Sequence, residues 1–434
     1  MTCRASLLLL FLLAVPVAAE GAASQKSGSW SAPVVVVPAF ADRETRLPVV
    51  TLDGHGNASA VWEVFSRGGT GYVGATADRQ AGRGWTAPMQ LAGGVAAQLA
   101  RDRQGDLLAV WTDVAGISQR IRAAFRPRGG RWGAPVYVSP AGEQASVPKA
   151  TLDARGRALV VWTGYSSASF TVESASRGTS GRWSRAVTVA RGNSGDPDMA
   201  MDASGRALVV WDGQAGATRV ASRSPSGNWT PPATLSSPND QGHNPKVALN
   251  AAGTAIAVWM GAPPGQAAQT LEAAIRPAGG RFGSARVVTG EVTGMSKVAL
   301  TAYGEAVVIS SDRDVLYSNV RLPGGRFGSR QVLGNGFAPT VGVDARGDAI
   351  AVWTRSDGTN LFVHAARRLS RHTFGAGVDL APVGPDCSLH RCLVGGEAAL
   401  AVSPRGSAIA IWIVQPHPQQ GFDSSVEAAE YAQP

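Results

Sequence analysis

The stretch Leu152–Gly164 reads LDARGRALVVWTG, and close copies of it recur along the chain. MDASGRALVVWDG follows at Met201–Gly213, and VDARGDAIAVWTR at Val343–Arg355. The apolar half of each copy has the β-branched character of a buried strand. The D-x-x-G before it is typical of a tight turn, because aspartate bonds backbone two residues on and glycine accepts a positive φ. Each copy therefore predicts a turn followed by a strand.

This pattern, D-x-x-G-x-A-x-x-V-W, can be followed through eight copies, most of them 48 to 51 residues apart. The last position, here called the anchor, is occupied by Trp62, Trp111, Trp162, Trp211, Trp259, Ser310, Trp353 and Trp412. The aspartate is present in five copies, as Asp53, Asp102, Asp153, Asp202 and Asp344. A period near 50 residues indicates a propeller or a solenoid. We interpret the aspartates as turn-forming residues and not as catalytic acids.

A second motif, an aromatic residue among glycines and small polar residues, follows each anchor by about 20 residues. Its aromatics are Trp85, Trp132, Trp183, Trp229, Phe282, Phe327 and Phe374. A strand precedes the motif and another follows it, as in Val172–Arg177 and Ala186–Ala190, so each repeat predicts four antiparallel strands, lettered A to D. Four-stranded repeats in tandem are typical of a β-propeller.

The eighth copy of the second motif lies at the other end of the chain, in Gly28–Val37, GSWSAPVVVV. The C-terminus stops after the segment expected to form strand C of the last repeat. We therefore predict an all-β, eight-bladed β-propeller of four-stranded antiparallel blades and no helical domain. Ala32–Val37 is expected to complete the last blade beside Ser424–Tyr431, because a closed ring leaves no exposed strand edge.

The first residues are typical of a secretory signal peptide, with Arg4 before the apolar run Leu7–Ala14 and a small-residue cleavage site ending at Ala19. We expect residues 1–19 to be removed and residues 20–434 to form a single β-propeller domain, secreted or held in the periplasm or cell envelope. No other apolar run is long enough to span a membrane. In an exported protein, Cys387 and Cys392 predict a disulfide. They offer too few ligands for a zinc site, and no metal or cofactor is expected.

The net charge of +9 comes almost wholly from arginine, since lysine occurs only at positions 26, 149, 246 and 297. Basic charge can indicate nucleic acid, but export favours a glycan, an anionic envelope polymer or a protein as partner. A basic surface without any partner is the open alternative. We expect no nucleic acid ligand, no membrane span and a monomeric state.

Seven arginines stand six residues before the aromatic of the second motif: Arg79, Arg126, Arg177, Arg223, Arg276, Arg321 and Arg368. Four more, Arg131, Arg182, Arg281 and Arg326, directly precede the aromatic. Repetition predicts a basic rim on one face of the ring. Two interpretations stay open: the arginines pack on the adjacent aromatic ring or bond the C–D turn, or they bind an anion.

Antiparallel strands place the A–B and C–D turns on one face of the ring, the uniform face, and the B–C and D–A loops on the other, the variable face. Because loops on a rigid scaffold carry function, the binding site is expected on the variable face. Its longest loops are Gly384–Glu397 and Gln415–Asp423. The candidate binding residues are His390, Arg391, His417, Gln419, Phe422, Asp423, Asp196, Asp212, His243 and Arg355. A disulfide that merely staples a long loop is the alternative interpretation.

In architecture the repeats resemble the broad class of exported bacterial β-propeller proteins, with a distant similarity to sialidase-like propellers. Thr45-Arg46-Leu47-Pro48 is similar to the Phe/Tyr-Arg-Ile-Pro motif of sialidases, whose arginine holds the substrate carboxylate. Proline recurs at the position of Pro48 in other repeats, as at Pro148, so we interpret Pro48 as a residue of strand A. Asp153 and Trp162 lie farther apart than the equivalent residues of the sialidase Asp-box.

The sequence favours a non-catalytic, exported scaffold that binds a glycan, an anionic envelope polymer or a protein. Uniform repeats and the absence of a catalytic motif support this hypothesis. The alternative is a sialidase-like glycoside hydrolase or a polysaccharide lyase. A hydrolase of that kind needs two carboxyl groups at a defined separation, which the spacing of residues along the chain does not reveal.

Overall fold

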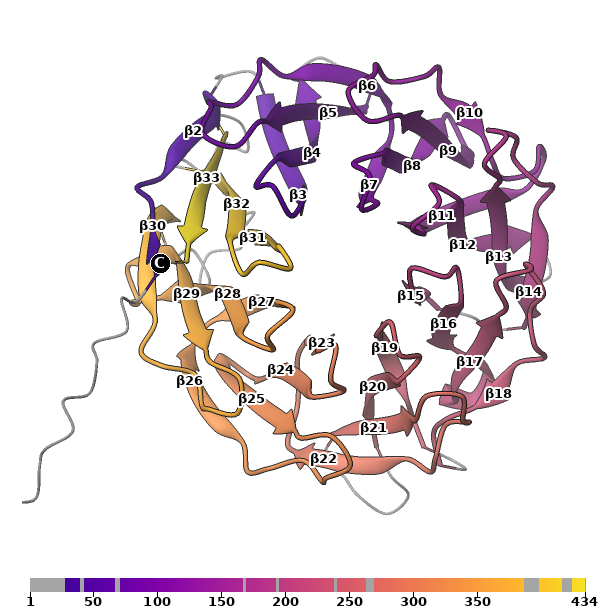
Figure 1. Cartoon of the computed structure of the whole chain (residues 1–434). Helices are drawn as coiled ribbons and strands as arrows, with labels where there is room; N and C mark the ends of the chain where they lie inside the picture. Colours follow the sequence, from indigo (N-terminus) through magenta and orange to yellow (C-terminus); the bar gives the residue numbers. More distant parts are fainter. Residues whose placement is uncertain are drawn as a thin grey trace, which may run out of the picture.

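The computed structural model describes residues 28–39, 43–66, 71–166, 169–192, 195–237, 240–262, 269–385, 398–415 and 424–433. These residues form the predicted ring of eight antiparallel blades, an eight-bladed β-propeller (Figure 1). Strand A of each blade lies nearest the ring axis and strand D lies at the rim. Within the described residues the sole helix is the three-residue 3-10 turn Gln214–Gly216.

The strands follow the predicted order in every blade. The A strands are β3 (Arg43–Leu52), β7 (Val95–Arg101), β11 (Gln144–Leu152), β15 (Asp198–Met201), β19 (His243–Leu249), β23 (Ser296–Leu300), β27 (Phe337–Val343) and β31 (Ala398–Val402). The B strands are β4 (Ala58–Ser66), β8 (Leu107–Ala115), β12 (Ala158–Ser166), β16 (Ala207–Asp212), β20 (Ala255–Gly261), β24 (Ala306–Asp312), β28 (Ala349–Ser356) and β32 (Ala408–Val414). The C strands are β5 (Tyr72–Arg79), β9 (Ser118–Arg126), β13 (Ser169–Arg177), β17 (Thr218–Arg223), β21 (Thr270–Arg276), β25 (Val315–Arg321), β29 (Asn360–Arg368) and β33 (Ser425–Ala432). The D strands are β6 (Met89–Gly93), β10 (Val136–Tyr137), β14 (Val187–Arg191), β18 (Ala233–Thr234), β22 (Arg286–Gly290), β26 (Gln331–Asn335), β30 (Val378–Pro385) and β2 (Val34–Val37), the last extended by β1 (Ser29–Trp30).

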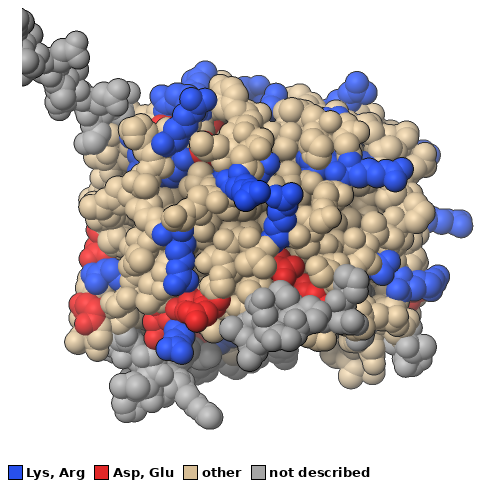
Figure 2. Space-filling model, turned by 90° about the horizontal axis from the view of Figure 1, so that it is seen from below, with Lys and Arg blue, Asp and Glu red and all other residues tan. Residues whose placement is uncertain are grey.

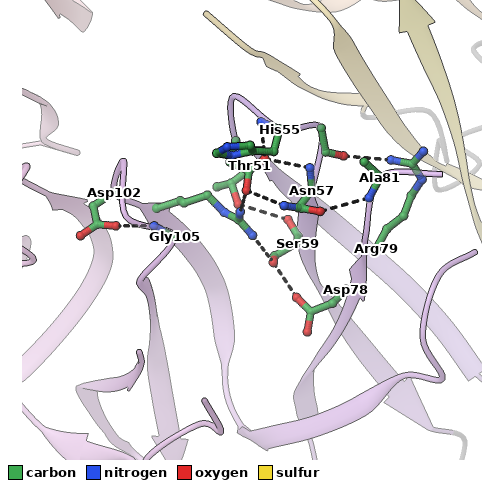
Figure 3. Close-up of polar contacts among 12 residues, drawn as sticks. Thr51, His55, Asn57, Ser59, Asp78, Arg79, Ala81, Asp102 and Gly105 are labelled. Carbon is green, nitrogen blue, oxygen red and sulfur yellow. Dashed lines mark hydrogen bonds and ion pairs between the residues drawn. The ribbon is translucent and has the colours of Figure 1, made fainter. Parts of the chain in front are cut away.

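The aspartate of the repeat forms the A–B turn, as predicted. In blade 1, Oδ1 of Asp53 accepts hydrogen bonds from the backbone N–H groups of His55 (2.9 Å) and Asn57 (2.8 Å), and Gly56 has φ +84°. Figure 3 shows His55 and Asn57 of this turn. Where aspartate is missing, another side-chain oxygen takes its place: Asn250 accepts from the N–H of Thr254 at 3.0 Å. These side chains therefore form the turn through hydrogen bonds to its backbone.

The hydrophobic core is divided among the junctions between blades. Each of the eight core clusters joins the B strand of one blade to the B strand of the next. At the junction of blades 2 and 3, for example, Leu108 and Val110 pack against Val160 and the anchor Trp162. The second-motif aromatic of blade 3, Trp183, covers the same cluster. The repeated tryptophan and aromatic are therefore explained by packing between blades.

The two ends of the chain close the ring in one blade. β2 pairs with β33, with Val34 opposite Ala428 and Val37 opposite Val426, and β1 pairs with the far end of β33. Val36 and Val37 are buried in the core between blades 8 and 1, whereas Val34 and Val35 are exposed. The predicted closure by the N-terminal strand is confirmed.

Five of the A strands carry a β-bulge immediately before one particular position. The pairing with strand B shifts between Ser146 and Lys149 in blade 3 and between His243 and Lys246 in blade 5, and equivalent shifts occur in blades 1, 2 and 7. One residue of each bulge has a positive φ, such as Val147 (+52°) and Asn244 (+55°). Bulges redirect the side chains that follow them. In this ring they precede the residues that line the axis.

Several predictions concern residues outside the described part of the chain. These are the signal peptide, the disulfide between Cys387 and Cys392, and both long loops of blade 8. They stay predictions. Among the described residues, no helix is long and apolar enough to cross a membrane.

Candidate functional site

One position of strand A varies in residue type around the ring and is polar or charged in most blades. It lies opposite the residue that precedes the anchor, as Lys149 lies opposite Val161. Around the ring the position is occupied by Val49, Gln98, Lys149, Asp198, Lys246, Lys297, Thr340 and Ala399. We call it the axial position. It holds three of the four lysines of the chain.

The three axial lysines form one electrostatic cluster. Burial lowers the pKa of Lys246, and the positive charges of Lys297 and Lys149 act in the same direction, while the negative charge of Asp198 opposes them. Lys149 belongs to blade 3, Lys246 to blade 5 and Lys297 to blade 6, so charges on the innermost strands of three blades act on one lysine. Each of blades 3 to 6 contributes one charged residue to the cluster.

The bulge of blade 5 orients its lysine directly. Nζ of Lys246 donates hydrogen bonds to Oδ1 of Asn244 (2.6 Å) and to the carbonyl oxygen of Pro245 (3.0 Å), both residues of the bulge. In the neighbouring blade, Oδ2 of Asp198 accepts from the N–H of Val247 at 2.9 Å. The backbone thus fixes one cation and one anion side by side at the axis.

Three predicted variable-face residues adjoin this cluster. Burial raises the pKa of Asp212, while the positive charges of His243 and Lys246 lower it and the exposed Asp196 raises it further. Oδ1 of Asp212 is buried and has no hydrogen-bond partner among the described residues. The Nδ1 atom of His243 lies 3.0 Å from the carbonyl oxygen of Gln241. Residues predicted separately in two repeats therefore meet at the junction of blades 4 and 5.

A cavity of about 950 Å³ opens along the same A strands toward the uniform face. Its walls are the ends of the A strands and the A–B turns of six blades, including Ala150, which follows Lys149, and Leu249 of the Lys246 strand. This volume lies within the range of ordinary ligand sites. The sequence placed the candidate binding residues on the variable face, whereas this cavity lies at the opposite mouth of the axis.

Comparisons with known proteins do not show a family for this chain. No protein-family model matches the chain, and no curated protein matches it. Similar solved structures are β-propellers that include a protein of unknown function from Dyadobacter fermentans, 12% identical with a TM-score of 0.49 over 94% of this chain and 100% of that one. An α-L-arabinanase from Penicillium chrysogenum is 12% identical, with a TM-score of 0.45 over 92% and 98%. The polysaccharide lyase Uly1 is 9% identical, with a TM-score of 0.44 over 77% and 90%.

Arg355, the fourth described candidate, lies in blade 7 apart from the axial cluster. Its guanidinium forms a double ion pair with Asp379, with Nε–Oδ1 and Nη2–Oδ2 distances of 3.0 and 2.6 Å. The Nδ1 atom of His364 lies 2.6 Å from the same carboxylate. Arg46, the arginine of the sialidase-like stretch, is likewise paired with Glu44 and lies over the ring of Tyr72. Both arginines thus have carboxylate partners within the protein.

Six candidates, His390, Arg391, His417, Gln419, Phe422 and Asp423, lie outside the described residues and stay predictions. Within the part of the chain that is described, no three His, Cys, Asp or Glu side chains are grouped to hold a metal ion.

The seven repeated arginines mainly connect blades. Arg79 is paired with Glu430 of blade 8, and Arg368 with Glu305 of blade 6. Arg126 contacts Asp78 of blade 1 through Nη1–Oδ2 (2.5 Å) and Nη2–Oδ1 (2.7 Å). We expected packing on the adjacent aromatic ring or bonding to the C–D turn. Ring packing occurs, as for Arg126 on Trp132, but the strongest partners lie in the preceding blade.

Charge is nevertheless unevenly distributed along the ring axis. On the side of the molecule shown in Figure 2, Lys and Arg side chains spread over the upper part and Asp and Glu gather lower down. Arg131, Arg182, Arg281 and Arg326 are exposed on the C–D turns. They form an exposed cationic set distinct from the axial lysines.

Proposed function

We propose that the protein is a non-catalytic binding protein for an acidic glycan, which it holds at the ring axis through Lys149, Lys246 and Lys297. The observation that carries the proposal is the placement of these lysines. A chain that otherwise uses arginine for positive charge puts three of its four lysines at one structural position, around one axis. Export, predicted from the N-terminal residues, belongs to this proposal.

The mixed charge of the cluster supports a glycan more than a simple anion. Ammonium groups pair with the carboxylates of a uronic acid, while Asp198 and Asp212 can accept hydrogen bonds from sugar hydroxyls. Lysine is a flexible point-charge donor, so three lysines on a rigid ring can adapt to several positions along a polymer. Rigid strands with adaptable tips are suited to recognition of a repeating ligand.

The test is calorimetric titration of the full-length protein with a polyuronate and with a neutral polysaccharide of similar length. The triple variant Lys149→Gln, Lys246→Gln, Lys297→Gln should lose binding to the polyuronate. A matched control, Arg131→Gln, Arg182→Gln, Arg281→Gln, removes the same charge from exposed turns and should keep most of the affinity. Equal losses in both triple variants would show that binding depends on net charge and not on the axial site.

A polysaccharide lyase is the second candidate, and the state of Lys246 favours it. An eliminating enzyme needs a base to remove the proton next to a uronate carboxylate and cations to stabilise the negative charge that develops. A lysine with a lowered pKa, beside Asp198 and two further lysines, offers both functions. The same polyuronate tests it: new unsaturated chain ends that form with the parent protein and not with Lys246→Gln would establish catalysis and replace the binding proposal.

A further inference from the structure

The junction between blades 3 and 4 differs from two other junctions, in which the repeated arginine binds a carboxylate on strand C of the preceding blade. In those two junctions the carboxylate stands directly before the position of the repeated arginine and binds the arginine of the next blade: Glu430 binds Arg79, and Asp78 binds Arg126. At blades 3 and 4 the facing residue is Ser176, opposite Arg223. This junction therefore lacks the carboxylate.

A cavity of about 190 Å³ occupies the space at this junction. Asp153, Arg157, Ser176, Arg223, Pro225 and Ser226 are among the residues that line it. This smaller cavity adjoins the axial cavity, because Asp153 and Met201 line both.

Arg177, Arg157 and Asp153 are the other charged residues that line this cavity. The guanidinium of Arg177 lies over the ring of Phe125, 3.7 Å from its centroid, and Arg157 and Asp153 are matched with one another. Arg157 donates from Nε to Oδ2 of Asp153 (2.5 Å), from Nη1 to the carbonyl oxygen of Pro225 (3.0 Å) and from Nη2 to that of Ser204 (3.0 Å). Oδ1 of Asp153 accepts from the backbone of its own turn. Arg157 and Asp153 therefore offset each other.

Arg223 is the unmatched charge. Its half-buried guanidinium makes no hydrogen bond or ion pair with any residue in the described ranges. Burial lowers its pKa and the positive charge of Arg157 lowers it further, while the negative charge of Asp153 acts in the opposite direction. At the next junction the equivalent Arg276 also faces a serine, yet it donates to Oγ of Ser222 (3.3 Å) and the carbonyl of Gly253 (3.4 Å). An arginine without a carboxylate is thus bonded there but not in blade 4.

We propose that the cavity between blades 3 and 4 binds a tetrahedral oxyanion, sulfate or phosphate, held by Arg223 in place of the carboxylate that Ser176 does not provide. Guanidinium presents paired N–H donors that match two oxygens of such an anion, and the Ser176 hydroxyl can donate a further hydrogen bond. The anion is either free or an ester group on a larger glycan. This site does not depend on the axial lysines.

The test compares thermal unfolding of the full-length protein in inorganic phosphate, in sulfate and in chloride at equal ionic strength. The parent protein should gain stability in the two oxyanions, and Arg223→Gln should lose that gain. The control Arg276→Gln should keep it, as should the triple lysine variant. If the gain appears only with a sulfated or phosphorylated glycan, and still requires Arg223, the ligand is the ester. No response to any of these anions, or an unchanged response in Arg223→Gln, would overturn the proposal.

A second variant keeps the fold intact while filling the site. Ser176→Asp restores the arrangement of Asp78 and Arg126, so it should raise the melting temperature in chloride and abolish the response to phosphate. A Ser176→Asp protein that still responds to phosphate would show that the anion binds elsewhere.

Discussion

At the scale of single residues, the buried carboxyl group of Glu272, which lies beside Asp240, determines a pH response. Oδ2 of Asp240 accepts from the indole N–H of Trp259 (3.2 Å) and Oδ1 from the N–H of Ala262 (2.7 Å). Burial raises the pKa of Glu272 to about 7, and the neighbouring Asp240 raises it as well. Both side chains are almost fully buried. A carboxyl pair enclosed in this way affects stability and does not form the accessible acid–base pair of a glycosidase.

The sign of the effect follows from the direction of the shift. The pKa of Glu272 is raised from 4.5 to about 7 in the folded state. Below 4.5 both folded and unfolded states hold the proton, and between the two values only the folded state holds it. Stability therefore falls as the pH rises from about 4.5 to about 7, by on the order of 3 kcal/mol in total.

Glu272→Gln should remove this dependence. We expect the variant to be more stable than the parent at pH 8, by up to about 3 kcal/mol, and equal to it near pH 4. Melting temperatures across the pH range check the prediction. The exposed Glu143→Gln serves as control and should leave the profile unchanged; a parent profile without any decline between these values would contradict the account.

At the scale of elements, the bulged A strand brings the axial residues into place at a conformational cost. Val147 is a β-branched residue with φ +52°, a region that such residues rarely adopt. Asn244 occupies the same place in blade 5 with φ +55°, and asparagine tolerates this conformation. The bulge is the same in both blades although the residues differ.

Val147→Asn should therefore stabilise the protein, by about 1 kcal/mol, because it relieves the backbone strain. The control is Val187→Asn in β14, an exposed strand residue that is half accessible to solvent and has no positive φ. That change should be neutral or destabilising, because asparagine is disfavoured in strands. The two melting temperatures, each compared with the parent, decide the matter. A loss of stability in Val147→Asn would show that packing of the valine side chain stabilises the protein by more than its backbone strain costs.

The arginines between blades form the other structural device at this scale. Arg126→Gln should cost about 2 kcal/mol, because it leaves the partly buried Asp78 without its charged partner. Arg131 is exposed on the C–D turn, five residues after Arg126, and Arg131→Gln should change stability by no more than about 0.5 kcal/mol. Chemical denaturation of the two variants measures the difference, and equal stability would refute the connecting role of Arg126.

The sequence repeats predict the strands and turns of each blade, but they do not predict which side chains of different blades contact one another. Eight anchors and the displaced second motif predict the blades and the closure, because packing between blades repeats with the chain. The axial cluster is harder to predict, since Lys149, Lys246 and Lys297 look unrelated until the strands are placed around one axis. A signal was present nonetheless: each lysine stands four residues before the turn residue of its repeat. The strongest partners of these arginines lie in the preceding blade, so the spacing of residues within one repeat does not identify them.

At the scale of the whole molecule, the ring is stabilised by the segment that joins its ends. Deleting Lys26–Phe40 removes β1 and β2 and exposes the edge of β33. It also removes Val36 and Val37 from the core between blades 8 and 1. Burial of these two side chains contributes about 3–6 kcal/mol, which is comparable with the net stability of an ordinary domain.

This deletion should cause aggregation or a steep fall in melting temperature. Deletion of Glu20–Gln25, which removes none of the residues of β1 or β2, should have little effect. Calorimetry of the two truncated proteins distinguishes them. Equal melting temperatures would show that the ring does not depend on closure by the N-terminal strand.

Chemical modification of lysine tests the proposed axial binding site directly, because the chain has only four lysines. The measurement is the rate of acylation of each lysine, determined by mass spectrometry with and without a polyuronate. We predict that the polyuronate slows modification of Lys149, Lys246 and Lys297 together and leaves Lys26 unchanged. Unchanged rates at the three axial lysines, under conditions where the polyuronate is bound, would contradict the central claim that the ring binds its ligand at the axis.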